Sequence, residues 1–141
     1  MKKYQEIFAK LPYSDPFLFV EELISVTEDG VAATFTFDEN SAFYKGHFVD
    51  RPVTPGVILT ETMAQNGVAC LGIFLVGNAD VENIAMTSVN VEFLKPVFPG
   101  ETVSIRSQKE YFRFGKLKCR VWMYNSREEE VCSGTICGMI L

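Results

Sequence analysis

The stretch that decides the fold is FYKGHFVDRPVTPGVILTETMAQN, residues 43–66. It contains the only histidine of the chain, His47, followed by two prolines that lead into an apolar run. Pro55 predicts the start of a helix, with Thr54 as its cap, because a proline in the first helical turn lacks only an N–H that would have no partner there. Glu61 follows inside the apolar run, where a carboxylate costs free energy unless it is paired or used.

The helix is predicted to run from about Pro55 to Val76, and it is apolar nearly all round, which is typical of a buried helix. A short helix is expected at residues 2–11. Strands are expected within residues 16–26 and at 31–37, 84–94, 102–112, 116–124 and 131–141, the first two joined as a hairpin. One long helix and about six strands predict an α+β fold in a single domain, residues 1–141, with an antiparallel sheet wrapped around the helix.

Composition and charge exclude several classes of protein. The net charge of −5 argues against general nucleic-acid binding. Four cysteines without close spacing and a single histidine indicate free core thiols rather than a metal or redox site. The N-terminus has no signal peptide pattern, and the longest apolar segment, residues 68–76, is shorter than a membrane span. We therefore expect a cytoplasmic protein with no metal, cofactor, membrane or nucleic-acid partner.

The quoted stretch resembles the signature of the FabZ-type β-hydroxyacyl-acyl carrier protein dehydratases. That signature begins with Gly-His-Phe-Pro, followed after two variable residues by a proline and after two more by Pro-Gly-Val. Glu-Ala-Met-Ala-Gln lies downstream. This chain has Gly46-His47-Phe48-Val49, Pro52, Pro55-Gly56-Val57 and Glu61-Thr62-Met63-Ala64-Gln65, with the same spacing from histidine to glutamate. It departs at Val49, usually proline in the family, and at Thr62, usually alanine. LPYSDPFLFV (11–20), VEFLKPVFPGETV (91–103) and VCSGTICGMIL (131–141) also resemble the family, so the resemblance covers nearly the whole chain.

The resemblance implies a hot-dog fold and a cofactor-free reaction. A (3R)-3-hydroxyacyl-acyl carrier protein would lose water to give a trans-2-enoyl thioester, in fatty-acid or polyketide/polyene-type biosynthesis. It assigns His47 as the base at C2, Glu61 as the acid at the C3 hydroxyl, and the Gly56 N–H as the donor to the thioester carbonyl. Phe48 and Val57 would contact the substrate.

Each role has a structural alternative. Imidazole titrates near physiological pH, but a loop histidine can simply be satisfied by backbone groups. An apolar helix stripe would raise the pKa of Glu61 and favour the protonated acid, unless Arg51, Gln65 or Asn66 pairs with it. Pro55 and Gly56 can serve only as the turn into the helix.

The expected partners are an acyl carrier protein and a second copy of the chain. Residues 106–120 hold six cations and one acid, which would steer an acidic partner, although the sequence alone favours a solvated strand face. The resemblance suggests carrier docking at Lys95, Arg113, Lys116 and Lys118. It also implies a homodimer in which each site takes His from one protomer and Glu from the other, and it leaves open further assembly to a trimer of dimers. The alternatives are an acyl-thioester hydrolase of the same fold and a non-catalytic carrier-binding subunit.

Overall fold

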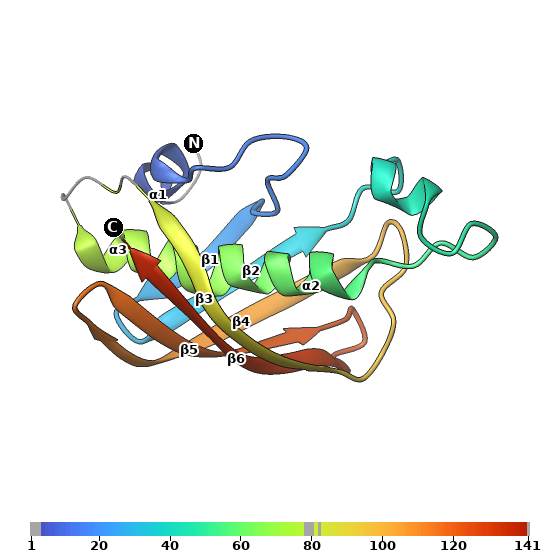
Figure 1. Cartoon of the computed structure of the whole chain (residues 1–141). Helices are drawn as coiled ribbons and strands as arrows, with labels where there is room; N and C mark the ends of the chain where they lie inside the picture. Colours follow the sequence, from blue (N-terminus) through green and yellow to red (C-terminus); the bar gives the residue numbers. More distant parts are fainter. Residues whose placement is uncertain (1–3, 78–80, 82, 141) are drawn as a thin grey trace.

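A six-stranded antiparallel sheet curls around one long helix in the computed structural model, which describes residues 4–77, 81 and 83–140 (Figure 1). The sheet order is β1-β2-β4-β5-β6-β3. The strands are β1 (Glu22–Thr27), β2 (Gly30–Thr36), β3 (Ile84–Phe93), β4 (Thr102–Arg113), β5 (Lys116–Tyr124) and β6 (Glu130–Ile140). The helices are α1 (Gln5–Lys10), the 3-10 turn η1 (Ala42–Lys45), α2 (Gly56–Met63), the π-helical η2 (Ala64–Ala69) and α3 (Cys70–Val76). The predicted α+β architecture with a sheet wrapped around a central helix is confirmed.

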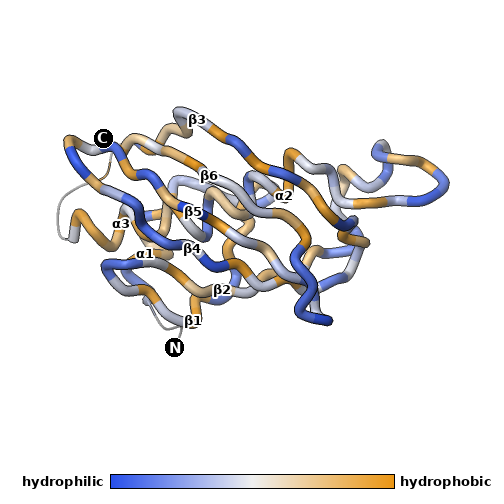
Figure 2. Tube along the Cα trace, turned by 90° about the horizontal axis from the view of Figure 1, so that it is seen from below, coloured by the Kyte–Doolittle hydropathy of each residue, from blue (hydrophilic) through white to orange (hydrophobic). Residues whose placement is uncertain are grey.

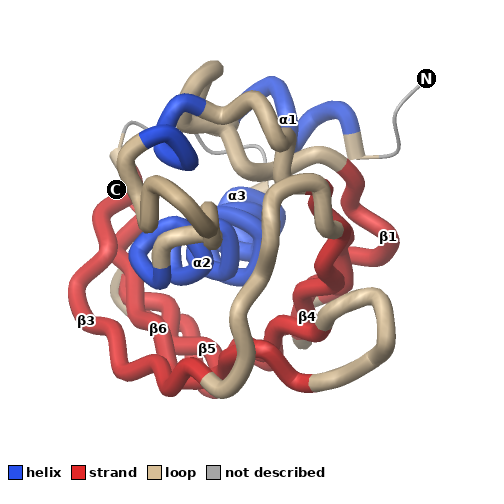
Figure 3. Tube along the Cα trace, turned by 90° about the vertical axis from the view of Figure 1, so that its right-hand side faces the viewer, coloured by secondary structure: helices blue, strands red, loops and turns tan. Residues whose placement is uncertain are grey.

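Alternation along β5 shows why the sheet curls around the helix. Leu117, Val121 and Met123 are fully buried, as is Cys119, whereas the residues that alternate with these four lie on the outer face. Burying each such side chain contributes about 1.5–3 kcal/mol. Viewed along the helix, the sheet surrounds α2 and α3 on three sides, from β1 to β3 (Figure 3).

The central helix is continuous over residues 56–76, but its middle turn is π-helical, which the sequence did not predict. The turn approaches the sheet closely at Gly67, where an added Cβ would lie 3.0 Å from Ser107 Cβ and 3.1 Å from Val121 Cγ1. A π-turn shifts side-chain directions by one position and is frequent at functional sites. Here it contains Gln65 and Asn66, both fully buried.

Three local predictions were wrong. Thr54 does not cap the helix: Pro55 precedes the first turn, and Thr54 Oγ1 instead lies 2.6 Å from Tyr44 Oη. The first strand begins only at Glu22, because the preceding segment bonds to helix side chains rather than to a strand. The N-terminal helix is shorter than predicted, and residues 2, 3 and 141 of the predicted elements lie outside the described residues.

The central helix also corrects the expectation about membrane-span length. Residues 56–76 are long and apolar enough to cross a bilayer. Glu61 is the one charged residue in this range, and Gln65 and Asn66 are its two amides. Two-thirds of its most apolar part is buried within the protein (67%). The buried core helix of a soluble protein can have the same length and apolar composition.

Strand β3 forms one edge of the sheet and exposes apolar side chains. Within the described residues it pairs only with β6, so its other side has no strand partner among them. Met86, Val89 and Phe93 are each 41–49% exposed on it. Hydrophobic and hydrophilic residues alternate along this edge (Figure 2).

Candidate active site

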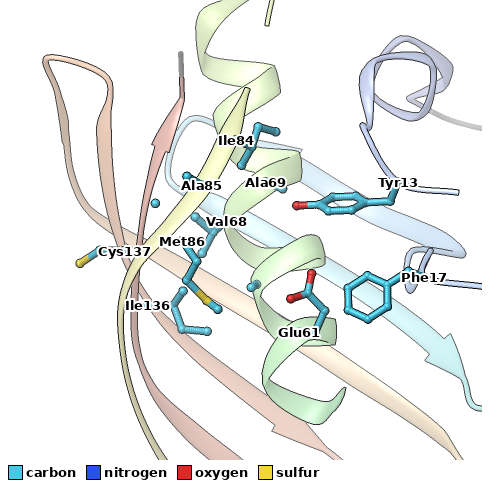
Figure 4. A pocket seen from close by; sticks show the side chains of 12 residues that line it. Tyr13, Phe17, Glu61, Val68, Ala69, Ile84, Ala85, Met86, Ile136 and Cys137 are labelled. Atoms are coloured by element: carbon cyan, nitrogen blue, oxygen red, sulfur yellow. The ribbon is translucent and has the colours of Figure 1, made fainter. Parts of the chain in front are cut away.

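A cavity of about 250 Å³ opens beside the middle of the central helix and contains Glu61 (Figure 4). Four segments line it: the N-terminal segment, the helix, β3 and β6. The lining residues are Tyr13, Phe17, Glu61, Ala64, Val68, Ala69, Ile84, Ala85, Met86, Ile136, Cys137 and Gly138. Glu61 is the only charged residue among them, in surroundings that are otherwise mainly apolar.

The Glu61 carboxylate is half-buried and held by Gln65. Gln65 Nε2 donates to Glu61 Oε2 at 2.9 Å and to the Phe17 carbonyl at 3.0 Å. Gln65 Oε1 accepts from the Phe19 N–H at 2.8 Å, which fixes the orientation of the amide. Of the three partners considered from the sequence, Gln65 is therefore the one that contacts Glu61.

Asn66 ties the same segment to the helix. Its Nδ2 donates to the carbonyls of Phe19 and Thr62, each at 2.8 Å. Thr62, one of the two departures from the dehydratase signature, is fully buried and its hydroxyl donates to the Ile58 carbonyl at 2.7 Å. The extra hydroxyl is thus satisfied within the helix.

His47 lies on the loop before the helix, with one ring nitrogen occupied. Its Nδ1 is 2.9 Å from the Val53 carbonyl oxygen, and because a carbonyl only accepts, Nδ1 carries the proton and Nε2 has the free lone pair in the neutral ring. The imidazole stacks on Phe48, with ring centroids 4.3 Å apart. Phe48 and Val49, the second departure from the signature, are exposed.

The base of this loop is closed by buried hydrogen bonds. Tyr44 Oη and Thr54 Oγ1 are 2.6 Å apart, both residues are buried, and the Thr54 N–H donates to the Val97 carbonyl at 2.8 Å. Burial raises the pKa of Tyr44, outweighing the opposite effect of the Thr54 hydrogen bond, so the phenol stays neutral. These contacts fix the two ends of the segment that carries His47.

Gly56 lies in the first turn of α2, where a backbone N–H has no partner within the helix. The ring of Phe93 stands over it: an added Cβ would meet Phe93 Cζ at 3.2 Å. The neighbouring Val57 is 77% exposed, so it points away from the core. The helix start thus combines a free donor with accessible apolar surface.

The structure does not bring His47 and Glu61 to one cavity within a single chain. His47 does not line the Glu61 cavity, and the loop around residues 46–53 projects beyond the start of α2 (Figure 1). The alternative predicted from the resemblance, a site shared between two protomers, remains a prediction.

Tyr13 is the cavity residue that sequence reasoning missed. Its phenol faces the cavity from the segment after α1 (Figure 4), and its pKa is raised to about 12, mainly by burial and then by the electrostatic effect of Glu61, with a smaller effect from Cys70. No pattern around residue 13 signals this position, since the segment has no regular structure.

The cations suggested for docking differ in their surroundings. Lys95 pairs with Glu129 at 3.0 Å and Lys118 with Glu110 at 3.4 Å. The guanidinium of Arg113 lies 4.5 Å from the centroid of Tyr111. Arg113 and Lys116 also flank Phe114, which is 97% exposed at the β4–β5 turn, around a shallow hollow completed by Tyr111 and Met139.

No cluster of three or more metal-ligating side chains occurs in residues 4–77, 81 and 83–140. All four cysteines are free and buried. Burial raises the pKa of Cys70, Cys119 and Cys132 to about 12 each, so these thiols are protonated core residues.

Comparison with known proteins identifies the family. The family model for ApeI-like proteins, described as ApeI dehydratase, matches residues 23–135. A 3-hydroxyacyl-[acyl-carrier-protein] dehydratase FabZ from Wolbachia pipientis is 35% identical over 137 residues, covering 93% of this chain and 91% of the relative. A FabZ from Sinorhizobium fredii is 34% identical over 123 residues, covering 86% and 75%.

Solved structures support the fold. The dehydratase heterocomplex ApeI:P from Xenorhabdus doucetiae superposes with a TM-score of 0.80 at 15% identity, covering 96% of this chain and 90% of that one. A hypothetical thioesterase with coenzyme A from Streptococcus pneumoniae gives a TM-score of 0.64 at 16% identity, covering 85% and 84%. With a family model over most of its length and a relative 35% identical along nearly all of it, the chain belongs to the ApeI-like, FabZ-type 3-hydroxyacyl-[acyl-carrier-protein] dehydratases.

Proposed function

We propose that this dehydratase acts on (3R)-3-hydroxyacyl thioesters bound to an acyl carrier protein and releases trans-2-enoyl thioesters. The observation that carries the assignment of the site is the one carboxylate that the described residues contribute to the cavity, Glu61, which Gln65 holds among mainly apolar side chains. Elimination of water requires a base at C2, an acid at the C3 hydroxyl and a donor to the thioester oxygen. His47, Glu61 and the Gly56 N–H supply these three groups.

In this scheme the neutral His47 Nε2 takes the proton from C2. The C2–H electron pair forms the C2=C3 double bond as the C3–O bond breaks. Protonated Glu61 transfers its proton to the departing oxygen, which leaves as water. The Nδ1 hydrogen bond to Val53 supports the role of His47, because it orients the ring and leaves Nε2 free.

The Gly56 N–H would hold the thioester carbonyl oxygen as negative charge develops on it. The start of a helix carries a partial positive charge, and glycine presents no Cβ to the substrate. Phe48 and Val57, both largely exposed in the isolated chain, supply apolar surface for the acyl thioester. The Phe93 ring would have to share this space with the substrate.

A complete site requires a second copy of the chain in this proposal. The exposed edge of β3, with Met86, Val89 and Phe93, offers unpaired backbone groups and apolar side chains that a second β3 strand would cover. Such pairing would let the His47 loop of one protomer approach Glu61 of its partner. Further assembly to a trimer of dimers is compatible with this arrangement.

Carrier docking is proposed at Arg113 and Lys116, with Lys95 and Lys118 as secondary contacts because both are already paired with carboxylates. The carrier-linked substrate places the enzyme in fatty-acid or polyketide/polyene-type biosynthesis in the cytoplasm. The fold similarity to thioesterases raises hydrolysis as the competing reaction. The Xenorhabdus structure is a dehydratase heterocomplex. The assembly that competes with a homodimer is therefore a complex with a different partner chain.

The test is turnover of carrier-bound 3-hydroxyacyl and 2-enoyl thioesters followed by mass spectrometry. We expect reversible loss and gain of one water, reduced at least about 1,000-fold in His47→Ala and Glu61→Gln. Release of free acid and free carrier would assign a thioesterase instead. Carrier binding without turnover of either thioester would leave a non-catalytic subunit.

A further inference from the structure

Tyr13 places a second polar atom in the Glu61 cavity. Its phenol and the Glu61 carboxylate face the same space, on the same side of the central helix (Figure 4). The lining also contains two sulfur atoms, in the Met86 thioether and the Cys137 thiol. The Cys137 side chain points away from Glu61 in the same view. Among the described residues of the lining, two side chains therefore present oxygen atoms to a ligand, those of Tyr13 and Glu61, and the others are mainly apolar.

The Tyr13 hydroxyl has no hydrogen-bond partner within the described part of the chain. It is half-buried, and its neighbours in the cavity are carbon-rich side chains apart from Glu61. With a pKa near 12 it keeps its proton at physiological pH, so it is available as a donor to a ligand atom.

We propose that Tyr13 is a substrate-binding residue whose hydroxyl donates a hydrogen bond to the C3 oxygen of the 3-hydroxyacyl chain, the atom that Glu61 protonates. This assignment rests on the dehydratase site proposed above. The C3 oxygen is the polar atom of the acyl chain that must lie next to Glu61, and Tyr13 approaches the same place from the opposite wall.

The two side chains have different tasks at this oxygen. Glu61 gives up its proton as the C3–O bond breaks and becomes a carboxylate. Tyr13 remains a neutral phenol throughout and changes no bond; it orients the hydroxyl before the reaction and holds the released water afterwards. In the reverse direction it positions the water that adds to C3.

The experiment separates this contact from the shape of the cavity by comparing two ligands. In a His47→Ala background, which prevents turnover, the affinities of a 3-hydroxyacyl pantetheine thioester and of the saturated acyl thioester of equal length are measured by calorimetry. Tyr13→Phe removes only the hydroxyl. Tyr13→Met removes it with different packing, in case the first variant folds poorly. Tyr124→Phe, outside the cavity, is the matched control.

We expect Tyr13→Phe to weaken 3-hydroxyacyl binding by about three- to tenfold, the range for one neutral hydrogen bond, and to leave the saturated ligand unchanged. Equal weakening of both ligands, or of neither, would overturn the proposal. Turnover by the enzyme without the His47 substitution is measured separately. If that enzyme failed to dehydrate while Tyr13→Phe still weakened binding of the 3-hydroxyacyl ligand alone, the dehydratase assignment would be wrong. The hydrogen bond from Tyr13 to the C3 oxygen would still be supported.

Discussion

Gln65 donates a hydrogen bond of 2.9 Å to Glu61 across one turn of the central helix. The same amide is fixed from the other side by the backbone of Phe17 and Phe19. The π-turn that begins at Ala64 carries Gln65 into this position. The orientation of the candidate acid is thus set by an N-terminal segment more than forty residues away in the sequence.

Substitution of Gln65 by Leu is predicted to lower both activity and stability. The variant leaves Glu61 without its donor and the buried Phe19 N–H without its acceptor. We expect kcat to fall about 10- to 100-fold through misplacement of the acid, with little change in KM. The free energy of unfolding should fall by about 1–3 kcal/mol for the unsatisfied N–H. Steady-state kinetics and urea denaturation measure the two effects.

The control for this prediction is Gln108→Leu, an exposed position on β4. It makes the same chemical change away from the cavity and should alter neither quantity appreciably. If Gln65→Leu kept full kcat, the hydrogen bond to Glu61 would have no catalytic importance.

The Tyr44–Thr54 hydrogen bond is predicted to hold the His47 loop in its working conformation. Tyr44→Phe removes the hydroxyl and leaves buried Thr54 Oγ1 without a partner, so we expect a loss of about 1–3 kcal/mol in unfolding free energy. Activity should fall several-fold, because the end of the loop is released. Thermal unfolding and kinetics are compared with those of Thr54→Val and the double variant.

The double variant tests whether the two hydroxyls act together. If they do, Tyr44→Phe combined with Thr54→Val costs less than the sum of the single changes, because no unpaired hydroxyl remains. Strict additivity would show that the 2.6 Å contact has no energetic importance.

The sequence predicted the architecture well because the relevant signals are periodic. The strand predicted at residues 116–124 alternates between buried and outer positions in β5, and the long apolar run identified the central helix. Thr54 shows the limit of local reasoning: a residue suited to capping bonds instead with Tyr44, ten positions earlier. Tertiary contacts can override a local preference wherever a buried partner is available.

The candidate site was predictable only in part. A motif of unlike residues at fixed spacing predicted His47, Gly56 and Glu61; the structure places Glu61 in a cavity, and the catalytic roles of all three stay predictions. Gln65 was among the partners considered for Glu61, and the structure selects it. Tyr13 could not be found, because it reaches the cavity through the path of an irregular segment that no periodicity records.

The buried cysteines are predicted to be chemically inert in the folded protein. Burial raises the pKa of Cys70, Cys119 and Cys132 to about 12, so almost no thiolate is present at pH 8. Alkylation by iodoacetamide should be at least about 100-fold slower than in urea, as followed by intact-mass measurement. Rapid alkylation of any of the three in the native protein would contradict the buried placement.

Carrier docking should depend on the unpaired cations at the β4–β5 turn. Arg113→Glu and Lys116→Glu are expected to raise KM for carrier-linked substrate at least about fivefold at low salt, and to leave KM for a pantetheine thioester unchanged. Lys118→Glu and Lys95→Glu should have smaller effects, because each cation already pairs with a carboxylate. Equal KM changes for both substrates would place these residues outside a carrier surface.

The last prediction concerns the sharing of each site between two protomers. His47 does not line the Glu61 cavity of its own chain, and the loop around residues 46–53 projects beyond the start of α2, while β3 exposes an apolar edge that a second copy would cover. In a dimer formed from one His47→Ala chain and one Glu61→Gln chain, one shared site has both wild-type residues and the other has neither. Refolding the two inactive variants together should therefore restore about a quarter of wild-type activity, since about half the dimers are mixed and each has one working site. Refolding either variant alone is the control. If the mixture stayed inactive although native mass spectrometry detected mixed dimers, each site would belong to a single chain, and the loop of residues 46–53 would have to fold back onto its own helix for catalysis.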